Sequence, residues 1–122
     1  MSRGYATAGA LSGFIAVAAG AFGAHALKAH LSSDLLQVFE TGARYQMYHA
    51  FALLAAAFVA GNENHRPALW AARLFLAGTA LFSGSLYALA LTGITRFGLV
   101  TPFGGLAFLA GWLCLAGAVR RR

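Results

Sequence analysis

The stretch FGLVTPFGGLAFLAGWLCLAGAV, residues 97–119, contains no charged side chain. About 20 helical residues cross the hydrocarbon core of a bilayer, so this run is long enough to span a membrane as a helix. It includes Thr101 and Pro102, a helix cap followed by the residue favoured at the first helical position. It does not alternate polar and apolar residues, which argues against a membrane strand. The stretch therefore predicts a membrane helix.

Three further apolar runs extend this interpretation to the whole chain. They cover residues 5–27, 45–60 and 68–92, with His25 as the only strongly polar side chain of the first and Arg73 near the start of the third. The composition agrees, because 60% hydrophobic and 10% charged residues lie far from the usual soluble balance of about half apolar and a quarter charged. We therefore expect a single all-α domain that forms an integral membrane four-helix bundle.

The first apolar run could alternatively be a secretory signal. Arg3 precedes it, and the small residues at 19–21 (AGA) and 24–26 (AHA) resemble a cleavage site. Its apolar region is about twice the usual length of a signal core. We therefore expect this run to be retained as the first membrane helix.

The segment between the first two runs is too polar to cross a membrane, yet it has the pattern of a helix. Ser32 or Ser33 can cap it, and Asp34 suits the positive end of a helix dipole. Its apolar side chains then share one face, namely Leu35, Leu36, Phe39 and Ala43. This pattern predicts a short amphipathic helix over about 32–43 that lies along the extracytoplasmic membrane surface and runs into the second span.

Positive charges predict the orientation of the bundle. Four spans would place both termini and the 61–67 loop on one side, which collects Arg3, Arg66, Arg73, Arg120, Arg121 and Arg122. The opposite side holds Lys28, Arg44 and Arg96. Because cytoplasmic segments carry the excess of Lys and Arg, we expect both termini in the cytoplasm of a bacterial inner membrane. This also explains the net charge of +6, so no nucleic-acid partner is expected.

Small residues recur at helical spacing in three of the spans and predict close helix packing. The first span contributes Gly9, Ser12, Gly13, Ala16 and Gly20, the third contributes Ala80, Gly84, Ala88 and Thr92, and the fourth contributes Gly104, Gly105 and Gly111. Such ladders favour a tight bundle, and a homo-oligomer or a subunit of a larger membrane complex. They leave open which contacts form within a protomer and which join protomers.

The motif YQMYHA at 45–50 is the strongest candidate for a functional site. On a helix, Tyr45, Tyr48 and His49 share one face, with Gln46 beside His49. His25 ends the first span on the same predicted side of the membrane, and an ionisable group inside a membrane is a functional candidate by default. We therefore predict a polar cavity near His25 and His49, joined by three groups of the third span, Ser83, Ser85 and Tyr87.

Three roles are open for this cluster. The two histidines can form structural hydrogen bonds, take part in proton or small-solute transport, or bind a metal or haem. Zinc sites use three or four protein ligands and only two are available here, so no metal and no cofactor is expected. The serines lack a nucleophile elbow, and the carboxylates Asp34, Glu40 and Glu63 fall in surface segments. We therefore expect no catalytic residues and no enzymatic activity.

Several motifs, taken together and in order, resemble one family. They are GAFGAHALK at 20–28, YQMYH at 45–49, LFSGSLY at 81–87 with LTG at 91–93, and TPFGG at 101–105 with GW at 111–112. This set is similar to the domain of unknown function 423 family, to which transmembrane protein 256 of animals is related. The resemblance implies a small integral membrane protein of about four helices, with the first span retained, and it implies no activity or substrate. We expect an interaction or accessory protein whose surroundings are the lipid bilayer.

Overall fold

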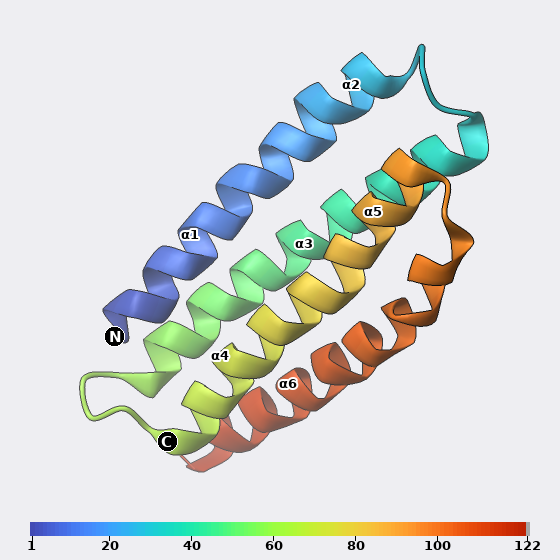
Figure 1. Ribbon diagram of the computed structural model, residues 1–122. Coiled ribbons are helices and arrows are strands. Elements are labelled where there is room, and N and C mark those ends of the chain that lie inside the picture. Colours follow the sequence, from blue (N-terminus) through green and yellow to red (C-terminus); the bar gives the residue numbers. More distant parts are fainter. Residues whose placement is uncertain (122) are drawn as a thin grey trace.

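The computed structural model describes residues 1–121, and all regular structure in that range is helical (Figure 1). The first rod covers residues 3–27 and joins α1 (Arg3–Val17), the π-helical turn η1 (Ala18–Gly23) and α2 (Ala24–Leu27). The second rod is a single helix, α3 (Ser33–Ala60). The prediction of an all-α fold is confirmed.

The third rod again contains a π-helical turn. It joins α4 (Arg66–Gly78), η2 (Thr79–Ser83) and α5 (Gly84–Thr92). A 3-10 turn, η3 (Thr95–Leu99), then leads into the fourth rod, α6 (Thr101–Arg121), which begins at the predicted Thr101-Pro102 pair.

The four rods lie side by side, each antiparallel to the one before it in the chain (Figure 1). The first rod packs on α3, α3 also packs on all parts of the third rod, and α6 packs on α4 and η2. Both termini lie at the same end as the loop between α3 and α4. There the amino group of Met1 donates a hydrogen bond to Asn62 Oδ1 at 3.0 Å, and Ala60, Ala68 and Ala118 pack together.

The prediction of a separate surface helix over residues 32–43 is wrong. Ser32 caps a helix as expected, because its Oγ accepts a hydrogen bond from the Leu35 backbone N–H at 3.2 Å. That helix is α3, which continues for 28 residues because no proline interrupts it. Its face with Phe39 and Ala43 packs on the first rod, at Gly23 and Gly20. Residues 32–43 therefore form the first part of a long helix.

Three of the rods are long and apolar enough to cross a membrane. They are Arg3–Leu27, Arg66–Thr92 and, with η3 included, Thr95–Arg121. α3 is equally long but less apolar, because its first half carries Asp34, Glu40 and Arg44.

The centre of the bundle is built from small residues around the Phe75 and Phe108 rings. Phe75 on α4 is fully buried, and it packs in one cluster with Leu53 and with four alanines, Ala52, Ala56, Ala71 and Ala72. Alanine side chains let the axes of α3 and α4 approach closely, which raises the packing density that holds helices together in lipid.

The small-residue ladders of the first and fourth spans pack within the chain. A Cβ added at Gly9 would lie 3.1 Å from the Leu54 side chain on α3, and the other members of that ladder face α3 too: Ser12, Gly13, Ala16 and Gly20. On α6, a Cβ at Gly104 would overlap the backbone of Phe82, and one at Gly111 would lie 2.7 Å from the Phe75 ring. Substitution at Gly104 therefore requires the rods to move apart, whereas Gly9 and Gly111 require neighbouring side chains to shift.

Candidate functional site

The YQMYHA motif lies halfway along the bundle and not at the start of a membrane helix. α3 covers Ser33–Ala60, so Tyr45 and His49 belong to its central turns. The first rod has the same register, because Gly13, near its middle, faces Ala50. The helix that contains the second predicted span, 45–60, therefore begins twelve residues before Tyr45, at Ser33.

Gln46 joins three rods through one buried and one partly buried hydrogen bond. Its side chain is only 5% exposed. The amide nitrogen donates to Ser12 Oγ on α1 at 3.1 Å, and the amide oxygen accepts a hydrogen bond from the Tyr87 hydroxyl on α5 at 2.7 Å. Because both ends of the amide are paired with neighbouring rods, this group stabilises the bundle.

His49 is also fully paired. The indole N–H of Trp112 donates to His49 Nε2 at 3.1 Å, and an indole nitrogen can only donate. Nε2 is therefore the unprotonated nitrogen, which places the proton on Nδ1, and Nδ1 lies 2.7 Å from the Tyr45 carbonyl oxygen that accepts it. The imidazole is thus neutral in this structure, and both of its nitrogens are engaged.

Aromatic rings surround His49 on the sides that its hydrogen bonds leave. The Phe108 ring is stacked on the imidazole with centroids 3.4 Å apart and planes 6° from parallel. Phe75 and Trp112 approach at 5.8 Å and 5.9 Å. The His49 side chain therefore extends from α3 toward α4 and α6, where it forms part of an aromatic cluster.

The serines of the third rod are used for contacts between helices. Ser83 Oγ donates to the Gly42 carbonyl oxygen on α3 at 2.7 Å. Ser85 Oγ donates to the Phe82 carbonyl at 2.9 Å and lies 2.6 Å from Thr101 Oγ1 at the start of α6. Neither serine joins the histidines in a common cavity, and each one ties the third rod to a different neighbour.

His25 does not meet His49. It lies exposed in α2, next to Gly23, whose Cβ position is 3.2 Å from the Phe39 ring. Phe39 precedes His49 by ten residues on α3, which corresponds to about 15 Å along a helix axis. The prediction that the two histidines share one cavity at similar depth is therefore wrong. Within residues 1–121, no three His, Cys, Asp or Glu side chains come together in a way that could hold a metal.

An open pocket of about 730 Å³ is lined by residues of α3, η2 and α6. We call it the α3–α6 pocket, and it is lined by Tyr45, Tyr48, His49, Phe82, Pro102, Gly105, Leu106, Phe108, Leu109 and Trp112. Gly105, which was expected to pack a helix, instead keeps the pocket open, because a Cβ added there would meet only Phe82, at 4.0 Å. No lining residue carries a charge at neutral pH, since His49 is neutral.

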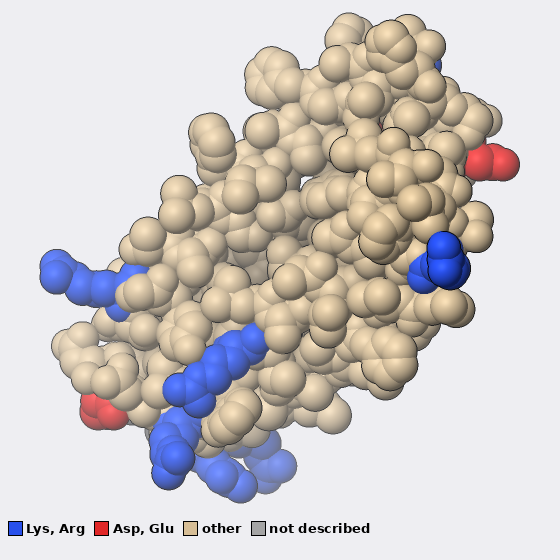
Figure 2. All heavy atoms as spheres, viewed as in Figure 1, with Lys and Arg blue, Asp and Glu red and all other residues tan. Residues whose placement is uncertain are grey.

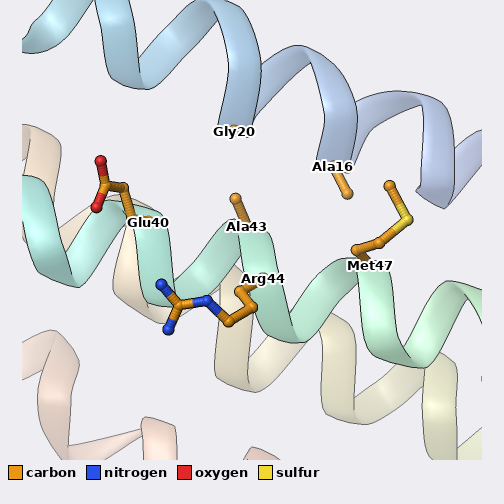
Figure 3. Close-up of a pocket in the computed structure, with 6 residues that line it drawn as sticks. All are labelled: Ala16, Gly20, Glu40, Ala43, Arg44 and Met47. Carbon is orange, nitrogen blue, oxygen red and sulfur yellow. The ribbon is translucent and has the colours of Figure 1, made fainter.

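A smaller groove of about 320 Å³ lies on the other side of α3, against the first rod (Figure 3). Ala43 and Met47 point from α3 toward Gly20 and Ala16, and Glu40 stands on the same side of α3, whereas the Arg44 side chain runs along α3. Two residues of this groove are charged, Glu40 and Arg44. Glu40 lies in the segment for which the sequence predicts a surface helix, and Arg44 directly follows that segment. They belong to the half of α3 nearer its N-terminus.

Sequence reasoning missed the two partners that define the surroundings of His49. Phe108 and Trp112 lie four residues apart on α6, and this spacing places them on one face of that helix. Nothing local to α6 indicates that this face meets α3, because the contact depends on how the rods pack. Ser12 was predicted only as a packing residue, and its hydrogen bond to Gln46 adds a polar contact to that role.

Comparisons with known proteins confirm the resemblance. The family model described as "Protein of unknown function (DUF423)" matches residues 19–105. A UPF0382 membrane protein of Staphylococcus saprophyticus is 47% identical over 88% of each chain. The UPF0382 membrane protein YwdK of Bacillus subtilis is 44% identical over 90% of each chain. The UPF0382 inner membrane protein YgdD of Escherichia coli K12 is 45% identical over 91% of this chain and 86% of its own. No solved structure matches the chain.

Proposed function

The chain belongs to the DUF423 family of membrane proteins, and on this premise we propose that it is a four-span inner-membrane protein that acts by binding within the bilayer and not by catalysis. α3 is the span that its composition leaves in doubt. Its 28 residues rise about 42 Å, which exceeds the roughly 30 Å of hydrocarbon. Its mid-helix polar groups, Gln46 and His49, are buried against the neighbouring rods, so the bundle shields them from lipid.

The distribution of charge supports a cytoplasmic location of both termini. The end that holds the termini also holds five described cations, namely Arg3, Arg66, Arg73, Arg120 and Arg121. Figure 2 shows Lys and Arg gathered toward this end on the face in view. Cytoplasmic segments of membrane proteins carry this excess.

A cysteine added at the C-terminus tests the orientation, in a chain where the native Cys114 is replaced by Ala. We expect no reaction with a membrane-impermeant maleimide in intact cells and full reaction after lysis. Labelling of intact cells would contradict the orientation.

The uncovered ladder of the third rod is the observation that carries the proposed binding role. A Cβ added at Gly84 would meet no atom within 4 Å, and the outward face of α4, η2 and α5 includes the exposed residues Ala77, Ala80 and Leu81. In lipid, small residues favour close approach of another helix. The ladder of the first span, and Gly104 and Gly111 of the fourth, already pack within the chain, whereas this face is open to a second copy or to another membrane protein.

Substitution of Gly84 tests this role. We expect Gly84→Leu to reduce oligomers to monomers, or to release a copurifying partner, as measured by light scattering of the detergent-solubilised protein. Gly117→Leu is the matched control, because a Cβ at Gly117 also meets nothing within 4 Å but lies on α6. A wild-type protein that is strictly monomeric and copurifies with no partner would contradict the proposal.

The transport and haem or metal hypotheses receive less support. Both require His49 to exchange a proton or to bind a ligand, and both of its nitrogens are engaged. His25, the second histidine of these hypotheses, lies about 15 Å away along the bundle. Retained flux or absorbance in a His49→Ala variant would remove this cluster from either role.

A further inference from the structure

The α3–α6 pocket contains two phenols whose hydroxyls lack a partner. Of the four tyrosines, Tyr5 accepts a hydrogen bond from Arg73 and Tyr87 donates one to Gln46. The hydroxyls of Tyr45 and Tyr48 form no hydrogen bond with any described residue in the range 1–121. Both side chains are partly exposed, Tyr45 at 37% and Tyr48 at 50%.

The position of these phenols makes their lack of a partner informative. Tyrosine in membrane proteins is concentrated at the two interfaces, where its hydroxyl reaches water. If the bundle spans the membrane as proposed, Tyr45 and Tyr48 lie near mid-depth, since they belong to the middle of α3. A hydroxyl without a partner is unfavourable in hydrocarbon, and an acyl chain has no atom that can pair with it.

The other walls of the pocket are aromatic and uncharged. The stacked pair of His49 and Phe108 forms its inner side. Trp112 lies against His49, and Phe82 lies 4.8 Å from the Tyr45 ring between centroids. Flat rings favour stacked or edge-on contact with other rings, and the absence of Lys, Arg, Asp and Glu from the lining disfavours a charged ligand.

We propose that the α3–α6 pocket binds a neutral, lipid-soluble ring compound with carbonyl acceptors, of the quinone class. The carbonyl oxygens accept hydrogen bonds from the Tyr45 and Tyr48 hydroxyls, and the ring lies among the aromatic walls. The volume of about 730 Å³ falls within the range of small-molecule sites. The open side of the pocket lets an isoprenoid tail extend into the bilayer. This inference depends on the proposed membrane placement and not on the proposed oligomer.

Trp112 is a built-in reporter of the pocket. The chain has two tryptophans, and the second, Trp70, does not line the pocket. In a Trp70→Phe variant in nanodiscs, we expect a short-chain ubiquinone with one isoprenyl unit to quench Trp112 fluorescence saturably. In the Trp112→Phe variant, the remaining Trp70 should show only the linear quenching that partitioning into lipid produces.

Two substitutions in the Trp70→Phe background connect binding to the pocket. Tyr48→Phe keeps the ring and removes one hydroxyl, and we expect it to weaken binding about threefold to tenfold, the effect of one hydrogen bond. Gly105→Leu fills the pocket and should abolish saturable quenching. Gly117→Leu, on the same helix but outside the pocket, should leave quenching unchanged.

Three results would overturn the inference. Linear quenching that is equal in wild type and Gly105→Leu would mean that the quinone only partitions into lipid. Displacement by hexadecane, together with no effect of Tyr48→Phe, would assign the pocket to acyl chains. If Gly105→Leu changed the oligomeric size of the protein, and the Trp70→Phe parent showed no saturable quenching, the pocket would be assigned to contact with a second copy of the chain. If the protein were monomeric but still showed saturable quenching, only the proposed oligomer would be refuted and the proposed ligand site would stand.

Discussion

Replacement of Gln46 by Leu removes the amide that joins α1, α3 and α5. The substitution keeps a side chain of similar size but eliminates a buried hydrogen bond to Ser12 and a partly buried one to Tyr87. Hydrogen bonds between membrane helices contribute about 0.6 kcal/mol on average and up to about 1.7 kcal/mol. We therefore expect Gln46→Leu to lower the free energy of unfolding by about 1 to 3 kcal/mol.

Most of this loss of stability should come from the hydrogen bond to Tyr87. Ser12 only accepts from the amide, so its own O–H can donate to a carbonyl of its helix with or without Gln46. The Tyr87 hydroxyl, in contrast, loses the acceptor to which it donates. Reversible unfolding in mixed SDS micelles, followed by circular dichroism, gives the free energies for a double-mutant cycle of Gln46→Leu and Tyr87→Phe. We expect a coupling energy of about 1 kcal/mol. Gln37→Leu, which removes an exposed amide from the same helix, is the control and should change stability by less than about 0.5 kcal/mol.

A stability of Gln46→Leu equal to that of Gln37→Leu would refute this reasoning. It would mean that the buried amide contributes nothing beyond its volume, and that apolar packing alone holds the three rods together. If the effects of Gln46→Leu and Tyr87→Phe were strictly additive, the hydrogen bond between these two residues would contribute nothing to stability, even if Gln46→Leu itself were destabilising.

Two further predictions concern helix packing and capping. Gly104→Ala should lower stability by about 1 to 3 kcal/mol because its Cβ would overlap Phe82. Gly105→Ala, with 4.0 Å of clearance, should raise stability by about 0.5 to 1 kcal/mol. The opposite order of these two effects would show that α6 is rotated relative to the third rod. Ser32→Ala should cost about 1 kcal/mol through loss of the cap on α3, and equal effects of Ser32→Ala and Ser33→Ala in the same unfolding assay would argue against that cap.

The parts of the fold that the sequence predicts depend on local patterns. Apolar runs long enough to cross a bilayer correspond to three of the rods. The ladder beginning at Gly9 predicts a helix contact, and the contact exists within the chain. Ser32 and Thr101 mark the starts of α3 and α6 in the structure. Each of these signals is contained in a few turns of one helix.

The predictions that failed concern depth and partners between helices. The apolar run that begins at Tyr45 predicts that a helix starts there, but α3 begins twelve residues earlier, at Ser33. The polar residues of its first half do not end a helix. This shift carries His49 to mid-bundle and away from His25. The contact between His49 and Trp112 depends on the packing of α6, which no pattern within α3 encodes.

The depth of Trp112 in the bilayer tests the central claim most directly. Trp70→Phe protein can be reconstituted with lipids that carry a quenching spin label either at the headgroup or deep in the acyl chain. We predict that deep labels quench Trp112 most strongly, because it contacts His49 at mid-bundle. Trp70, in the Trp112→Phe variant, should respond more to the headgroup label because it lies near the start of α4. Stronger quenching of Trp112 by the headgroup label would place the aromatic cluster at the membrane surface and contradict the account.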